Sequence, residues 1–187
     1  KLDINIEDIS IGMGLDKRIG GRFLRAGPAY GGSCFPKDTK AIINTADKFE
    51  TNLSVIKSVI KSNENRSLLL LQRVSDILKG KIKNQKICFL GVTFKANTDD
   101  MRDSSCLSMM PYLIKKGAII NYFDPTGEKD ELKKLKNVTF SKDINSAIMD
   151  SDLLIIHTEW NDFKSINFKK FIHNKNFKIF DMRNIYS

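Results

Sequence analysis

Residues 87–95 read Ile87-Cys88-Phe89-Leu90-Gly91-Val92-Thr93-Phe94-Lys95, an apolar run closed by a glycine turn. The run from 87 to 92 is apolar throughout, as strands of a parallel sheet covered by helices are. Similar runs follow at 119–123, 138–140, 153–158 and 177–181, with amphipathic stretches between and after them at 104–116, 128–136, 144–149 and 168–173. This alternation predicts an α/β fold with a Rossmann-like, doubly wound parallel sheet that binds ligands at the carboxyl ends of its strands.

Upstream of residue 84 the pattern is helical. Apolar residues recur at helical spacing over 36–49, and Pro36 suits the first helical position because its ring fixes φ. A second helix is expected from Ser54, as its N-cap, to about Gly80, which makes it roughly 40 Å long. Its polar middle, 63–66, indicates solvent exposure, with a kink or a partner surface as alternatives. We therefore expect an all-helical segment over 1–83 and a second domain over 84–187.

Cys34 stands out because it sits in Gly31-Gly32-Ser33-Cys34-Phe35-Pro36-Lys37-Asp38, just before a predicted helix. A helix N-terminus carries partial positive charge that favours a thiolate, and Lys37 adds to it. Asp38 lies in the first turn, within reach of a group attached to the sulfur. The thiol is thus a candidate nucleophile, although a half-buried, inert cysteine in a glycine turn is an equal alternative at this point.

Bulk properties exclude several classes of protein. The 187 residues carry a formal charge of +9, but the lysines are spread along the chain beside acidic residues, which argues against a nucleic-acid site and suits anionic small molecules. The three cysteines are far apart and there are two histidines, so we expect no metal site and a reducing, cytoplasmic location. No apolar run approaches the ~20 residues that a membrane helix needs.

The turn after residue 90 does not carry a dinucleotide fingerprint. G-x-G-x-x-G needs three glycines to bring backbone against a pyrophosphate, and this turn has one, Gly91. The second domain is therefore a poor primary NAD site, although it suits a mononucleotide. Lys95 and Arg102 follow the strand where such sheets bind anions, with plain surface charge as the alternative.

Three separated stretches together resemble the UDP-glucose 6-dehydrogenase branch of the nucleotide-sugar dehydrogenases. They are Gly14-Leu15-Asp16-Lys17-Arg18-Ile19-Gly20 leading to the cysteine loop, Gly91 to Ser104 with Phe94-Lys95 and Met101-Arg102-Asp103, and Thr158-Glu159-Trp160 followed by Asp181-Met182-Arg183-Asn184. The resemblance covers essentially the whole chain. It implies a central helical dimerisation domain, in part, over 1–83 and a UDP-binding domain over 84–187, with the family's N-terminal NAD-binding domain not included.

The resemblance implies oxidation of UDP-glucose to UDP-glucuronate with two NAD, through a thiohemiacetal and then a thioester on cysteine. Cys34 resembles that nucleophile, and Asp38 the residue that assists water or proton transfer. The residues implied to bind the sugar nucleotide are Arg25, Ala26, Tyr30, Gly31, Phe94, Lys95 and Arg183, joined by Arg18 from a neighbouring subunit of a homodimer. The residues implied to contact NAD are Cys34, Lys37 and Arg102.

Two rival functions stay open. GDP-mannose dehydrogenases share much of the cysteine loop, whereas Thr158-Glu159-Trp160 favours the UDP-glucose group, whose product serves polysaccharide biosynthesis. A noncatalytic UDP-sugar-binding and dimerisation module is the other alternative. Cys88 and Cys106 are expected to pack in the core, and a structural role is expected for His157 at the end of a strand.

Overall fold

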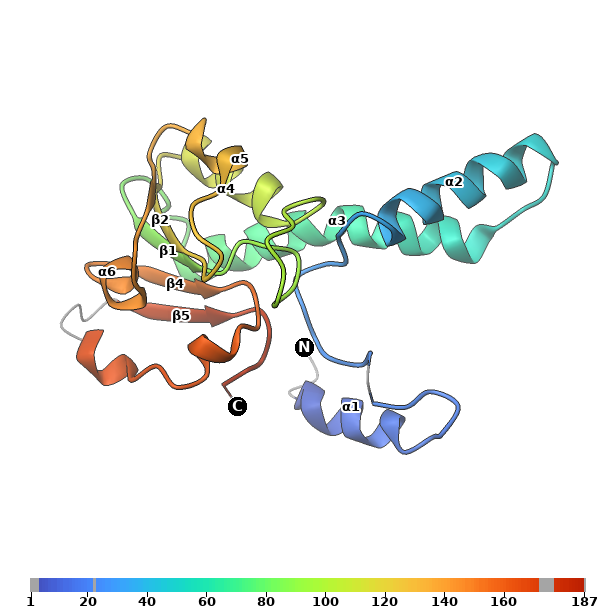
Figure 1. Ribbon diagram of the computed structural model, residues 1–187, viewed down its shortest axis with the longest axis horizontal. Helices are drawn as coiled ribbons and strands as arrows, with labels where there is room; N and C mark the ends of the chain where they lie inside the picture. The colour runs from blue at the N-terminus through green and yellow to red at the C-terminus, as the bar shows by residue number, and fades with distance from the viewer. Residues whose placement is uncertain (1–3, 22, 172–176, 187) are drawn as a thin grey trace.

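The computed structural model describes residues 4–21, 23–171 and 177–186. Figure 1 shows a twisted sheet with helices on its two faces, from which two antiparallel helices project as a long hairpin. A separate short helix near the N-terminus lies close to the C-terminal end of the chain. The expected α/β fold is confirmed.

Five parallel strands form the sheet in the order β3-β2-β1-β4-β5. They are β1 (Lys86–Leu90), β2 (Ile119–Phe123), β3 (Val138–Phe140), β4 (Leu153–Ile156) and β5 (Lys178–Asp181). The order reverses direction between β1 and β4, and open α/β sheets bind ligands outside the strand ends at such a point. The carboxyl ends of β1 and β4 are therefore where a site is expected.

Helices bury both faces of the sheet, which explains the apolar runs. Ile87 and Phe89 of β1 point to one side, where they pack with residues of α3 (Ser54–Ile77) and α4 (Cys106–Lys115). Cys88 and Leu90 point to the other, against α6 (Ile144–Ile148) and the 3-10 turns Asn161–Phe163 and Phe168–Phe171. Because neither face of β1 meets water, both alternating sets of side chains must be apolar.

The helical segment differs from expectation in three places. The structure has a helix that the sequence pattern did not single out, α1 (Ile6–Gly14), whose Asn5 side chain accepts a hydrogen bond from the Glu7 N–H. Helix α2 (Phe35–Lys48) begins one residue before Pro36. Helix α3 starts at Ser54 itself, with Leu53 as the capping residue, and is unbroken over about 36 Å, so Ser54 is not its cap and the polar middle causes no break.

Elements of the second domain are shorter than predicted. Helix α5 (Asp130–Lys133) is a single turn, and the predicted helix 168–173 is a 3-10 turn that ends at Phe171, beyond which 172–173 lie outside the described residues. β1 ends at Leu90 because Gly91 adopts φ +75°, outside the extended region. β4 ends at Ile156, since the His157 and Thr158 N–H groups both turn to the Leu90 carbonyl, at 3.0 and 3.3 Å.

Gly91 lies where the ends of β1 and β4 come closest. A Cβ at this position would lie 2.4 Å from the Thr158 Cβ and 3.2 Å from the Phe163 ring. Thr158 is fully buried, and its hydroxyl donates to the Thr93 carbonyl at 2.9 Å, so it has little freedom to move. Position 91 therefore requires glycine for two reasons: its φ angle is positive, and there is no space for a Cβ.

We predict that Gly91→Ala lowers the free energy of unfolding by roughly 3 kcal/mol or more, since left-handed strain and a clash in a packed region add. Urea unfolding measures it. Gly80→Ala is the matched control, because Gly80 has nearly the same φ, +76°, with nothing within 4 Å of its Cβ position. The control is expected to lose only about 1–2 kcal/mol, and equal losses in the two variants would contradict the clash.

His157 is fully buried at the end of β4, with Nε2 at 2.8 Å from the Ser105 hydroxyl and Nδ1 at 3.2 Å from that of Thr158. Burial lowers its pKa to about 3, and the charge of Arg183 acts in the same direction. The imidazole is therefore neutral at physiological pH and serves as a hydrogen-bonded part of the fold.

This burial predicts acid destabilisation. An unfolded histidine titrates near 6.5, so below that pH the unfolded chain takes up a proton that folded His157 refuses until about pH 3. The stability contribution is complete above pH ~6.5 and falls by up to ~1.4 kcal/mol per pH unit below it. In a His173→Gln background, which removes the other histidine, urea unfolding at pH 7 and 5 should show a loss of about 2 kcal/mol. Adding His157→Gln should abolish that loss, and an unchanged loss would refute the assignment.

Candidate functional site

Cys34 occupies the N-cap position of α2 and is exposed, whereas Cys88 and Cys106 are buried; all three cysteines fall within the described residues. Burial raises the pKa of both buried thiols, that of Cys106 to about 12. The Cys34 Sγ lies 3.5 Å from the Ser33 hydroxyl, and the Cys34 carbonyl accepts the Asp38 N–H at 2.8 Å as the helix begins. Cys34 is therefore the thiol that a reactant reaches from solvent.

Lys37 and Asp38 form an ion pair on the first turn of α2, with Nζ 2.6 Å from Oδ1. Both side chains are mostly exposed. Asp38 is the main cause that raises the pKa of Lys37, and Cys34 contributes a smaller effect in the same direction. The predicted cation, Lys37, and the predicted carboxylate, Asp38, thus lie together near the thiol of Cys34.

The cysteine loop, residues 25–34, packs against the segment after β1. A Cβ on Gly31 would lie 2.5 Å from the Asp103 carbonyl oxygen, and one on Gly32, at φ +88°, would lie 2.8 Å from the Phe94 ring. The Gly32 N–H donates to the Arg102 carbonyl at 2.8 Å. The two glycines therefore allow a backbone approach that brings Cys34 next to the 94–103 segment.

Arg102 extends from this segment to Asp100, which accepts hydrogen bonds from its Nε and Nη2 at 3.0 and 2.8 Å. Asp100 is the main cause that raises the pKa of Arg102, and the Cys34 sulfur adds to it. The side chain is 67% exposed, so it is accessible to an anion. Lys95 is also exposed, with Nζ 5.4 Å from the centroid of the Phe94 ring.

Arg183 ties the strand ends together. It follows β5, donates from Nε to the His157 carbonyl and from Nη2 to the Phe94 carbonyl, both at 2.9 Å, and forms an ion pair with Glu159 at 2.8 Å. Burial lowers its pKa, while Glu159 opposes that shift. A Cβ on Gly27 would lie 2.8 Å from Arg183 Nη1, so the cysteine loop also reaches this guanidinium.

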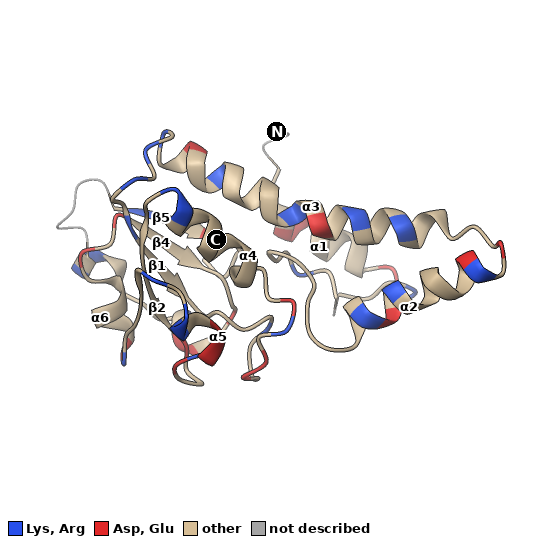
Figure 2. Ribbon diagram, turned by 90° about the horizontal axis from the view of Figure 1, so that it is seen from above, with Lys and Arg blue, Asp and Glu red and all other residues tan. Residues whose placement is uncertain are grey.

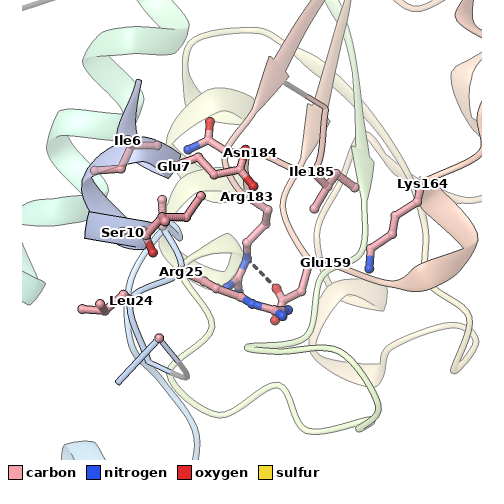
Figure 3. Close-up of a pocket in the computed structure, with 13 residues that line it drawn as sticks. Ile6, Glu7, Ser10, Leu24, Arg25, Glu159, Lys164, Arg183, Asn184 and Ile185 are labelled. Atoms are coloured by element: carbon pink, nitrogen blue, oxygen red, sulfur yellow. Dashed lines mark ion pairs between the residues drawn. The ribbon is translucent and has the colours of Figure 1, made fainter. Parts of the chain in front are cut away.

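A cavity of about 320 Å³ lies beside Arg183, between α1, the start of the cysteine loop and the strand ends (Figure 3). Of the predicted substrate residues, Arg25, Ala26 and Arg183 line it. The other polar residues of the wall, Glu7, Ser10, Glu159, Lys164 and Asn184, were not predicted from the sequence. Glu159 and Asn184 stand in motifs that carried the resemblance, so a signal existed for them. For Glu7 and Ser10 the signal was the start of α1, an Asn5 cap followed by acidic residues.

Other predicted residues lie elsewhere. Arg18 forms an exposed ion pair with Asp16 after α1 and is not among the residues that line the cavity. The Tyr30 ring packs edge-on against Phe35, 4.8 Å between centroids, and lines a second groove between α3 and α4. The structure thus brings together Gly31, Cys34, Phe94 and Arg102 as one group, and Arg25, Ala26 and Arg183 as another. The hydrogen bond from Arg183 Nη2 to the Phe94 carbonyl joins the two groups.

The sheet does not fit a dinucleotide at its first turn. Asp124, at the end of β2, is where Rossmann folds hold a ribose, but its carboxylate accepts the Val92 N–H at 2.9 Å and is fully buried beside Lys129. Within the described residues no group of three or more His, Cys, Asp or Glu side chains could hold a metal ion. None of the helices in this part of the chain is long and apolar enough to cross a membrane.

Comparisons with known proteins agree with the fold and the motifs. The profile for the UDP binding domain of the UDP-glucose/GDP-mannose dehydrogenase family matches residues 88–187, and that for the family's central domain matches 1–65. A UDP-glucose 6-dehydrogenase from Rhizobium meliloti is 40% identical over all of this chain, which spans 43% of that relative.

Solved structures are similar to this chain as well, among them the following two. A UDP-glucose dehydrogenase from Pyrobaculum islandicum superposes with a TM-score of 0.84 at 29% identity, over 95% of this chain and 40% of that one. A GDP-mannose dehydrogenase from Pseudomonas aeruginosa gives 0.71 at 25% identity, over 96% and 42%. The chain therefore spans less than half the length of these proteins. Since one profile alone covers more than half of its residues, the chain belongs to the UDP-glucose/GDP-mannose dehydrogenase family.

Proposed function

We propose that this chain is the central and UDP-binding part of an NAD-dependent UDP-glucose 6-dehydrogenase, which oxidises UDP-glucose to UDP-glucuronate for polysaccharide biosynthesis in the cytoplasm. One observation carries the proposal: a single loop, 25–34, begins at the cavity lined by Arg25 and Arg183 and ends at the exposed thiol of Cys34. A nucleotide bound at its start would extend its sugar along the loop toward the sulfur.

UDP-glucose is favoured over GDP-mannose by the degree of similarity. Among the solved structures, the UDP-glucose dehydrogenase superposes with a TM-score of 0.84 at 29% identity, against 0.71 at 25% for the GDP-mannose dehydrogenase. Arg25, Lys164 and Arg183 supply positive charge around the cavity for a diphosphate, and Glu7 and Glu159 supply hydrogen-bond acceptors. Phe94 packs against Gly31 and Gly32 beyond it, with Lys95 as a further cation. Tyr30, whose ring lies against Phe35, is proposed to contribute through its place in the same loop.

In the proposed reaction Cys34 acts on the C6 aldehyde of the sugar. Its thiolate adds to the carbonyl carbon to give a thiohemiacetal, oxidation of which leaves a thioester; water then releases the carboxylate and restores the thiol. NAD, used twice in succession, would supply the oxidant: one hydride leaves the C6 alcohol to give the aldehyde, and a second leaves the thiohemiacetal to give the thioester. Asp38, paired with Lys37 beside the thiol, orients water and takes up protons. Covalent capture keeps the aldehyde from escaping.

We infer that NAD is held mainly by an N-terminal domain outside this chain. The support is the single-glycine turn at Gly91 and the occupied carboxylate of Asp124, which leave no cradle for a pyrophosphate on this sheet. Arg102 and Lys37, both exposed beside Cys34, are placed to meet the cofactor from this side. The chain alone is accordingly expected to be inactive.

The hairpin of α2 and α3 supports the proposal of a homodimer. Large apolar side chains are exposed on it, namely Phe35, Ile42, Phe49, Val55, Val59, Leu68 and Leu69. Basic and acidic residues interleave along the same helices (Figure 2), a pattern that suits a protein partner better than nucleic acid. Arg18, which is 90% exposed, would then reach the neighbouring subunit's substrate. Sedimentation of the complete protein measures this association.

The complete protein is predicted to reduce NAD with UDP-glucose and to do so at least about tenfold less efficiently, in kcat/KM, with GDP-mannose or UDP-N-acetylmannosamine, because the contacts to the sugar nucleotide must fit one base and one hexose. Absorbance of NADH measures the rates. A preference for either competitor would overturn the substrate, and no reduction with any of them would favour the noncatalytic module.

Cys34→Ser in the complete protein is predicted to cut the steady-state rate of NADH formation to below about a thousandth, since the nucleophile that holds the aldehyde is lost. UDP-glucose affinity, measured by calorimetry, should stay within about threefold, because the thiol reacts with the substrate and does not anchor it. Ser33→Ala, which keeps the thiol beside it, is the control and should stay active. A variant that turns over normally would exclude the role of Cys34.

A further inference from the structure

Asn63 of α3 forms a pair of hydrogen bonds with the backbone of the cysteine loop. Its Oδ1 accepts the Tyr30 N–H, and its Nδ2 donates to the Tyr30 carbonyl, both at 3.0 Å. The side chain thus engages both backbone groups of a residue only four positions before Cys34. The polar middle of α3 was expected to face solvent, and for Asn63 that expectation is wrong.

Arg66 makes a second attachment one turn along the same helix. Its Nε donates to the Pro28 carbonyl at 3.0 Å and its Nη2 to the Gly27 carbonyl at 3.2 Å. Burial lowers its pKa, and the charge of Arg73 adds to that shift. Residues three apart share one face of a helix, so Asn63 and Arg66 form a single clamp on residues 27–30.

The cysteine loop is held from two sides, and the clamp acts on one of them. On the other side Gly27 lies against Arg183, and the Gly32 N–H is bonded to Arg102. Tyr30 sits between these contacts. Because the loop is restrained from both sides, releasing one side allows the segment that leads to Cys34 to shift relative to the cavity.

Asn63 and Arg66 matter more for the position of the cysteine loop than for the free energy of unfolding. Both are only half-buried, so water can replace their bonds after truncation, at a cost of about 1 kcal/mol each. A displacement of about 1 Å at a reacting group costs up to ~100-fold in rate. The rate is therefore the more sensitive quantity.

We propose that Asn63 and Arg66 are positioning residues, which hold the cysteine loop so that Cys34 meets the sugar bound at Arg25 and Arg183. The expected effect on kcat rests on the proposed function, because it requires that the protein oxidises UDP-glucose. The restraint on the loop is measurable without any substrate.

The test uses Asn63→Ala and Arg66→Ala in the complete protein. Hydrogen exchange should quicken by about tenfold or more in the peptide that carries the Tyr30 amide, which loses its acceptor in Asn63→Ala, while β1 and β4 exchange as before. We expect kcat with UDP-glucose to fall by about 10- to 100-fold, with KM for NAD nearly unchanged.

Matched controls lie on the same helix. Asn65→Ala and Arg73→Ala remove exposed side chains of the same types and should leave exchange and kcat as in the wild type. Arg66→Lys keeps a cationic donor group but loses the planar guanidinium whose two nitrogens reach the two carbonyls, so its kcat should lie between those of the wild type and Arg66→Ala.

Wild-type exchange and kcat in both alanine variants would overturn the proposal, and so would exchange that rises equally across the sheet, because that marks general loss of stability. If the wild-type protein does not oxidise UDP-glucose, the proposed function fails by itself. A gain in exchange confined to residues 27–34 would still support the clamp in that case.

Discussion

The site depends on the contacts of Arg183, whose side chain is only 12% exposed. The side chain bonds to carbonyls that follow β1 and β4, extends from the end of β5 and pairs with Glu159. A buried cation costs several kcal/mol unless such partners surround it, so the strand ends and the arginine require one another. The lowered pKa of Arg183 records that cost, and the opposing effect of Glu159 shows how it is offset.

From that anchor the site extends outward through close backbone contacts. Gly27 packs on the guanidinium, and Gly31 and Gly32 pack on Phe94 and Asp103 with no space for a Cβ. These contacts carry the loop from a positively charged cavity to the cap of α2, where an exposed thiol meets a helix N-terminus. Binding and chemistry are thereby placed on one short piece of chain, supported by the sheet on one side and by α3 on the other.

Much of the fold follows from local pattern. The β1 to β5 runs are apolar because both faces of the sheet are covered, and the alternation of strand and helix gives the parallel order. The prediction was incomplete at α1. This helix contains two glycines, which lower its propensity, and its apolar residues Ile6, Ile9 and Met13 recur at helical spacing but are exposed in this chain. The Asn5 cap helps it to form. The sequence predicted β1 and β4 to be longer than they are. A hydrophobic pattern carries no information about the φ angle of Gly91, where β1 ends, or about the hydrogen bonds of the His157 and Thr158 N–H groups, where β4 ends.

The sequence by itself determined the class of fold, the place of Cys34 just before a helix and the motifs that mark the family. Only the tertiary structure decided that Asn63 and Arg66 grip the cysteine loop, that Glu159 pairs with Arg183, and that α1 forms a wall of the cavity. The physical reason is range. Periodicity, capping and turn preference act between residues a few positions apart, whereas Asn63 reaches Tyr30 across 33 positions and Arg183 reaches Phe94 across 89. Such bonds depend on the path of the whole chain.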